Sequence, residues 1–215
     1  MTAHDTLIPD ARKFLTGLIA NNNREWWLDN KDTYDDQLKA PALTLLEDMV
    51  EPLAKMTDAQ IKPKLFRPHR DVRFSKDKTP YKTHLHMMWR VEAGAPQNPV
   101  FFFGVGLDYV TAGAGMMGFD KPVLENWRKM LDLDTDRMMG IVDQVETAGF
   151  TLREPALKRV PSPYDQDHPA GQLLRMKGCV ASGEIGAEGD LSDKLTQAFA
   201  ALWPLNDLLI SIAEA

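Results

Sequence analysis

The chain has 215 residues, of which 44% are hydrophobic and 26% charged, so it is long enough for one sizeable core and has a globular composition. Its formal net charge of −6 argues against a protein that coats nucleic acid with its whole surface, although a small basic cleft is compatible with it. The single cysteine, Cys179, excludes an internal disulfide framework, and the N-terminal residues lack the pattern of a signal peptide. We therefore expect a cytoplasmic protein without a membrane segment.

Helical periodicity dominates the first quarter of the chain. Apolar residues recur at helical spacing over residues 14–19, and a second helix is expected over residues 24–38, where Asn23 can cap the first turn. Pro41 should kink or restart this helix, because proline removes a backbone hydrogen bond. A further amphipathic stripe over residues 42–53 completes a set of N-terminal helices.

Strand-like patterns follow. Residues 85–91 alternate apolar and polar side chains, and further strands are expected over residues 100–105 and 109–114. Residues 84–114 therefore predict an antiparallel meander.

The second half of the chain mixes helical and extended patterns. The expected elements are a helix from Asp120, a helix over 134–148 that ends at Gly149, short extended pieces near 150–160 and 178–186, a small helix near 169–176, and a C-terminal helix over 190–213 that is broken at Pro204. This order indicates an α+β fold, with N-terminal helices packed on a mainly antiparallel sheet and further helices in the C-terminal half.

Residues 67–82, here called the basic segment, read RPHRDVRFSKDKTPYK. They hold six positive and two negative side chains, so the segment has a formal charge of +4, whereas the formal net charge of the whole chain is −6. Residues 70–74 are expected to be extended, which would place Arg70, Val72 and Phe74 on one face, and residues 75–80 should form a polar turn. A basic segment on an acidic body indicates an anionic partner.

The residue types of the basic segment suit phosphate or carboxylate oxygens. Guanidinium and ammonium groups supply charged donors, and hydroxyl groups lie beside the turn. The candidate ligand-binding residues in this segment are Arg70, Arg73, Ser75, Lys78, Tyr81 and Lys82. The partner would be a small molecule that contains phosphate, or a segment of nucleic acid.

Two carboxylates in the basic segment, Asp71 and Asp77, leave three hypotheses open. The first is a binding protein in which Asp71 orients an arginine. The second is a phosphoester hydrolase in which Asp71 or Asp77 removes a proton or binds a metal. The third is a structural or interaction protein in which arginine and aspartate side chains only stabilise a loop.

Several long stretches resemble a widespread family of uncharacterised proteins, domain of unknown function 2461. They are RDVRFSKDKTPYK at 70–82, FLTGLIANNNREWWLDNKDTYDDQLKAPALTLLEDM near the start, PSPYDQDHPAGQLLRMKG later and PLNDLL near the end. This coverage implies a single domain over residues 1–215. The family pattern has an arginine after two asparagines, matched by Arg24, which joins the candidate ligand-binding residues. A glycine of the pattern is replaced here by Pro163.

Other patterns are expected to be structural. Residues 113–118 match GxGxxG, but the helix should begin after the last glycine and the strands look antiparallel, so close-packed glycines are the better interpretation. His84 and His86 should share one side of a strand, where a metal would need a third ligand such as His69 or Asp71. We expect a polar sheet face there, a buried and inert Cys179, no metal site and no cofactor.

Overall fold

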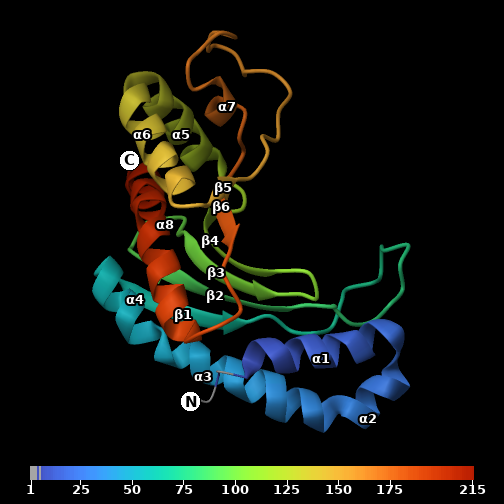
Figure 1. The fold of residues 1–215 in the computed structure, drawn as a ribbon. Coiled ribbons are helices and arrows are strands. Elements are labelled where there is room, and N and C mark those ends of the chain that lie inside the picture. The colour runs from blue at the N-terminus through green and yellow to red at the C-terminus, as the bar shows by residue number, and fades with distance from the viewer. Residues whose placement is uncertain (1–3, 5) are drawn as a thin grey trace.

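The computed structural model describes residue 4 and residues 6–215, and it is an α+β fold (Figure 1). Helices come first, followed by most of the sheet, and further helices follow in the C-terminal half. The described residues form a six-stranded sheet with the order β1-β2-β3-β4-β6-β5, in which every neighbouring pair is antiparallel. The predicted fold class is confirmed.

The strands agree with the predicted meander and add one strand before it. Their bounds are β1 Gln60–Leu65, β2 Leu85–Glu92, β3 Val100–Val105, β4 Val110–Met116, β5 Thr151–Leu152 and β6 Cys179–Glu184. β1 was not predicted because Pro63 and two lysines interrupt its pattern. A proline is tolerated there because β1 lies at the edge of the sheet.

The helices begin and end close to the predicted positions. Their bounds are α1 Leu7–Ala20, α2 Arg24–Tyr34, the π-helical turn η1 Asp35–Lys39, α3 Ala40–Asp48, α4 Val50–Thr57, α5 Lys121–Leu133, α6 Thr135–Thr147, α7 Gly171–Leu174 and α8 Leu191–Glu214. Asn23 caps α2 by accepting a hydrogen bond from the Trp26 N–H at 3.0 Å. Pro41 follows the π-helical turn, and Gly149 has a φ of +93° after α6. These three sequence signals are confirmed.

The predicted break of the last helix at Pro204 is wrong, because α8 runs without interruption from Leu191 to Glu214. Leu202, Leu205 and Leu209 around the proline are fully buried, so packing outweighs the hydrogen bond that the proline removes. α8 is long and apolar enough to cross a membrane, and it packs on β4, α5 and α6.

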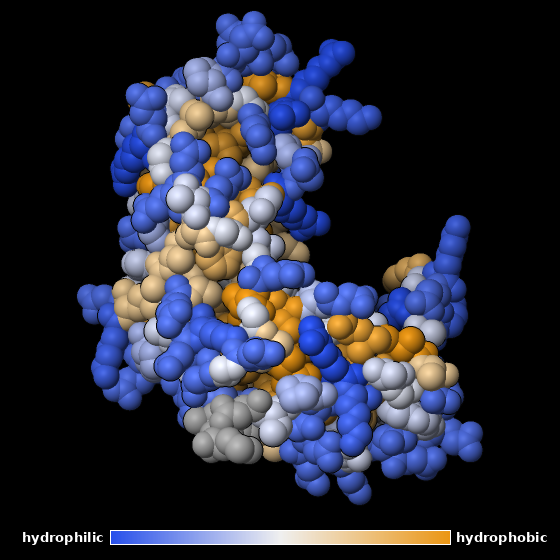
Figure 2. Space-filling model, in the orientation of Figure 1, coloured by the Kyte–Doolittle hydropathy of each residue, from blue (hydrophilic) through white to orange (hydrophobic). Residues whose placement is uncertain are grey.

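The two faces of the sheet differ. On β2, Leu85, Met87 and Trp89 are buried beneath the helices, whereas His86 and Met88 on the opposite face are only half-buried. We call this second face, which also carries Phe102 of β3, the open face. Figure 2 shows the molecule deeply hollowed on one side. In Figure 1 the connection from β1 to β2 and the connection from β5 to α7 extend on either side of this hollow.

Candidate functional site

The basic segment lies in the connection between β1 and β2, and residues 70–74 are not a strand. The only bridge in this described stretch pairs His69 with Tyr81, where Lys82 N–H donates to the Pro68 carbonyl at 2.7 Å. The expectation that Arg70, Val72 and Phe74 share a strand face is therefore wrong. Beyond the bridge, the Asp71 and Asp77 side chains accept hydrogen bonds from the backbone N–H groups of Arg73 and Thr79, which competes with a ladder of strand hydrogen bonds.

Arg70 is the centre of a hydrogen-bonded network inside the segment. Its Nη1 donates to Asp77 Oδ2 at 2.5 Å, to the Thr79 carbonyl at 3.1 Å and to the Thr79 hydroxyl. Asp77 also accepts from the Thr79 backbone N–H at 2.9 Å. These hydrogen bonds, first from the Thr79 backbone and then from Arg70, lower the pKa of Asp77 to about 2. A carboxylate of such low pKa is a weak base near neutral pH.

Asp71 is engaged in a similar way near the tip of the segment. Arg73 donates from Nε to Asp71 Oδ1 at 2.9 Å and from Nη2 to Asp71 Oδ2 at 2.6 Å, a two-pronged pairing. This hydrogen bonding lowers the pKa of the Asp71 carboxyl. Lys78 donates to the Val72 carbonyl at 3.0 Å. Neither aspartate is therefore placed as a free proton acceptor.

The segment is fastened to the turn between α1 and α2. Asn22 Nδ2 donates to the Tyr81 carbonyl at 2.9 Å, and the Tyr81 N–H donates to Asn22 Oδ1 at 3.1 Å. The ring of Tyr81 is 4% exposed and stacks on Trp27, with ring centroids 4.3 Å apart. Tyr81 thus serves as an anchor in the core, with its ring face already occupied by Trp27.

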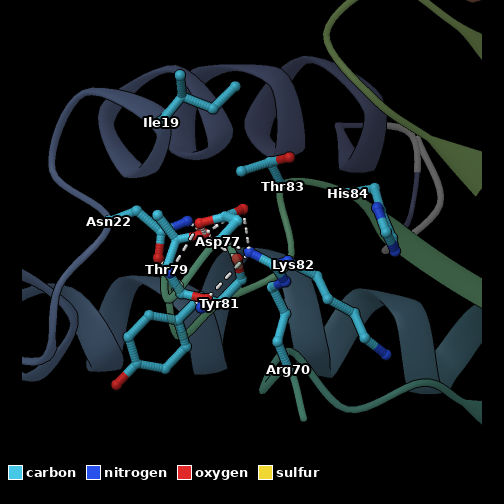
Figure 3. A pocket seen from close by; sticks show the side chains of 9 residues that line it. All are labelled: Ile19, Asn22, Arg70, Asp77, Thr79, Tyr81, Lys82, Thr83 and His84. Atoms are coloured by element: carbon cyan, nitrogen blue, oxygen red, sulfur yellow. Dashed lines mark hydrogen bonds and ion pairs between the residues drawn. The ribbon is translucent and has the colours of Figure 1, made fainter. Parts of the chain in front are cut away.

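A groove with a volume of about 430 Å³ lies between this anchor and the start of β2. We call it the Lys82 groove; its principal polar lining residues are Asn22, Arg70, Asp77, Thr79, Lys82 and His84 (Figure 3). Figure 3 shows the Lys82 side chain pointing away from the Arg70–Asp77–Thr79 network. Within residues 4 and 6–215, Lys82 has no carboxylate partner, and its Nζ lies 5.8 Å from the centre of the Phe66 ring.

His84 connects this groove to the open face of the sheet. Its ring stacks on that of His86, with centroids 3.7 Å apart and an interplanar angle of 20°. His86 Nε2 in turn lies 2.8 Å from the Tyr109 hydroxyl. Burial lowers the pKa of His86 to about 4, with the charges of His84 and Lys82 adding to the effect, and burial followed by Lys82 lowers that of His84. Both imidazoles are therefore neutral at pH 7.

Glycines make room for the rings on the open face. A Cβ at Gly104 would lie 2.9 Å from both His86 Cδ2 and Phe102 Cζ, and one at Gly106 would lie 2.3 Å from the Tyr109 ring. A second hollow of about 470 Å³, bordered by His86, Phe102 and Tyr109, lies over these residues. The open face thus presents a set of neighbouring rings beside Lys82.

Only part of the predicted ligand set gathers around the Lys82 groove. Arg70, Tyr81 and Lys82 border it, and so does the predicted catalytic candidate Asp77. The predicted residues that do not line it are Arg24, Asp71, Arg73, Ser75 and Lys78. Sequence reasoning missed Asn22 and His84 as lining residues. The run of three asparagines and the alternation of His84 with His86 were the available signals.

The remaining sequence motifs have structural explanations. Gly115 has a φ of +132°, and a Cβ there would lie 2.0 Å from the Cys179 carbonyl oxygen, so GxGxxG reflects close packing of β4 against β6. Burial raises the pKa of the Cys179 thiol to about 12, which makes it unreactive, as predicted.

His84 and His86 share one side of the sheet, while His69 packs with Trp27 and Tyr81. In the described part of the chain no three His, Cys, Asp or Glu side chains are grouped to hold a metal ion.

Comparison with known proteins adds a family and no activity. A family model described as "Conserved hypothetical protein (DUF2461)" matches residues 10–208, which include every residue that lines the Lys82 groove and the six strands described above. No curated protein matches the chain. The resemblance found in the basic segment and its flanking stretches is therefore confirmed, and the chain belongs to the DUF2461 family.

Proposed function

We propose that the protein binds an anionic ligand that contains phosphate, in the Lys82 groove. The observation that supports this proposal most directly is Lys82, which lines an open groove and whose ammonium group has no carboxylate partner in the described residues. A cation of this kind is more often neutralised where it serves structure alone, as Arg70 is here by Asp77. An anionic ligand would provide the missing charge.

Arg70 and His84 are placed to assist Lys82. The protein contacts of the Arg70 side chain all use Nη1, so within the described residues Nη2 and Nε remain free to donate to a phosphate oxygen. His84 is neutral at pH 7, and an adjacent phosphate would favour its protonated form and gain a second charged donor. Lys82, Arg70 and His84 would then each offer a charged donor to the anion.

The two other hypotheses account for less of this geometry. A purely structural network explains the hydrogen bonds that join Arg70, Asp77 and Thr79, but it does not explain why Lys82 lines the groove without a carboxylate partner. A hydrolase that uses Asp71 or Asp77 would need to release a carboxylate that an arginine already holds. Binding is therefore the function that the site supports best.

A thermal-shift screen with a matched pair of variants tests the proposal. Inorganic phosphate, pyrophosphate, sugar phosphates and nucleoside phosphates would each be added to the wild-type protein. A ligand at about 100 times its dissociation constant stabilises the folded state by about 2.7 kcal/mol, which for this chain length raises the Tm by roughly 5–10 °C. Lys82→Gln should weaken binding of the active ligand about tenfold or more, because a hydrogen bond to a charged group contributes at least that much.

Lys76→Gln is the matched control. Lys76 lies in the same segment and loses the same charge, but it does not line the groove and makes no polar contact within the described residues. It should bind like the wild type. An equal loss of affinity in Lys76→Gln and Lys82→Gln would mean that only the general charge of the segment matters, and no shift with any phosphate compound would contradict the proposal.

A further inference from the structure

An aromatic side chain stands almost free in solvent at the tip of the basic segment. Phe74 is 97% exposed, and the guanidinium of Arg73 lies 5.9 Å from the centre of its ring. An exposed ring beside a guanidinium suits a base of a nucleic acid, whose faces stack on aromatic side chains while its phosphates pair with lysine and arginine.

The open face of the sheet also carries aromatic rings with cations beside them. Phe66 is half-buried there, with Lys64 Nζ at 5.4 Å and Lys82 Nζ at 5.8 Å from its ring centre. The rings of His86 and Phe102 lie beyond it, perpendicular to each other and 4.9 Å apart. Exposed sheet faces that bear aromatic side chains are a recurrent platform for unpaired bases.

A second basic cluster lies on the other side of the hollow. Lys158, Arg159 and Arg175 border a pocket of about 280 Å³ on the connection from β5 to β6, and among the described residues none of them pairs with a carboxylate. Residues 153–177 hold five positive and three negative side chains, so this stretch is +2 on the acidic chain. We call these three residues the far cluster.

The separation of the two basic regions limits the kind of ligand that can reach both. From β2 to β5 the sheet has four intervals between strands, or roughly 19 Å at ~4.8 Å each. A single phosphate compound in the Lys82 groove would contact only one region. A flexible chain with a phosphate on every unit can contact both and place its bases on the rings between them.

We propose that the phosphate-containing ligand is a single strand of nucleic acid that lies across the open face, from the basic segment to the far cluster. This inference rests on the proposed function of the Lys82 groove and names the class of its ligand. Phe74 stacks on a base at one end, and Lys158, Arg159 and Arg175 hold backbone phosphates at the other.

Fluorescence anisotropy with a labelled oligothymidylate of about 12 nucleotides, within the ~4–16 range of single-strand sites, tests the stacking at Phe74. Phe74→Ala should raise the dissociation constant about fivefold or more, since base stacking contributes at least that much. Folding is not at risk, because the ring is 97% exposed. Leu133→Ala, which removes a side chain that is 79% exposed on α5, is the control and should bind like the wild type. An abasic oligomer of equal length should bind Phe74→Ala and the wild type equally.

The far cluster is tested by salt dependence. For a single strand the logarithm of the affinity falls with the logarithm of salt concentration by about 0.7 per phosphate contact, so Arg159→Gln should lower this slope by about 0.7. If Arg159→Gln has the same affinity and the same salt dependence as the wild type, the strand does not reach the far cluster and the inference is wrong. Oligonucleotides that fail to bind while pyrophosphate still binds through Lys82 would overturn this inference and leave the proposed function intact. An acidic peptide that binds as tightly as the oligomer would overturn the inference and assign the basic segment and the far cluster to a protein partner instead.

Discussion

The chemistry of the candidate site depends on which of its ionisable side chains are charged and which of the charged ones have a partner. Lys82 keeps an uncompensated charge, whereas Arg70 and Arg73 are each held by an aspartate. Beside Lys82 lies a pair of stacked imidazoles that burial keeps neutral. Of these features the sequence predicted the cations and the common side of the two histidines. It did not predict which cations would lack a carboxylate partner, because that depends on the course of an irregular segment.

The low pKa of His86 makes the stability of the protein depend on pH in a defined window. The unfolded chain takes up a proton on this imidazole near pH 6.5, whereas the folded protein resists protonation until about pH 4. Between these values the unfolded state binds more protons, so the free energy of unfolding falls as the pH is lowered from 6.5 to 4. His86→Gln should show a smaller fall, measured as urea midpoints at pH 7 and pH 5. Identical falls in both proteins would contradict the burial of a neutral His86.

Asn22 should contribute to stability through Tyr81, which is distant in the sequence. Asn22→Ala would leave the N–H and the carbonyl of Tyr81 without their partners, at a cost of about 1–3 kcal/mol in the free energy of unfolding. Urea denaturation measures this loss. Asn21→Ala is the control, since the Asn21 side chain donates to the Gly17 carbonyl at an exposed helix end. Equal stability of the two variants would show that Asn22 does not fasten the basic segment.

At the level of elements, periodicity was a good guide where packing agreed with it. The alternation in β2 and the helical spacing in α1 and α5 marked real elements, because those side chains face the core. The prediction of a strand over residues 70–74 failed since no described strand pairs with these residues and the Asp71 side chain accepts a hydrogen bond from the backbone N–H of Arg73. The prediction of a break at Pro204 failed because the buried leucines around it hold α8 together.

Gly104 of β3 is required by the rings that lie over it. In Gly104→Ala the added methyl group would displace His86 and Phe102, which should cost about 1–3 kcal/mol of stability and raise the pKa of His86 toward its usual range. NMR titration of the imidazole and thermal unfolding would measure both effects. Gly140→Ala on α6, where a Cβ meets nothing within 4 Å, should leave both properties unchanged or improve stability slightly. A Gly104→Ala protein with unaltered His86 would show that the rings do not depend on this glycine.

For the whole molecule, the sequence predicted the α+β class and the family but not the assembly of the site. The Lys82 groove is formed by Asn22, Arg70 and His84, which come from a turn between helices and from two ends of one connection. The register of a sheet and the docking of Asn22 on Tyr81 depend on contacts between distant residues, for which one sequence offers no local signal. The position of the far cluster relative to the basic segment was hidden for the same reason.

NMR titration of the five histidines with pyrophosphate tests binding in the Lys82 groove most directly. His84 borders the groove and stacks on His86, whereas His4 lies elsewhere in the fold, within hydrogen-bond distance of Ser192. We predict that pyrophosphate shifts the imidazole signals of His84 and His86 and raises the pKa of His84, that His4 stays unchanged, and that Lys82→Gln abolishes the effect. Signals of His84 and His86 that do not move at saturating pyrophosphate, or that move equally in Lys82→Gln, would contradict the account.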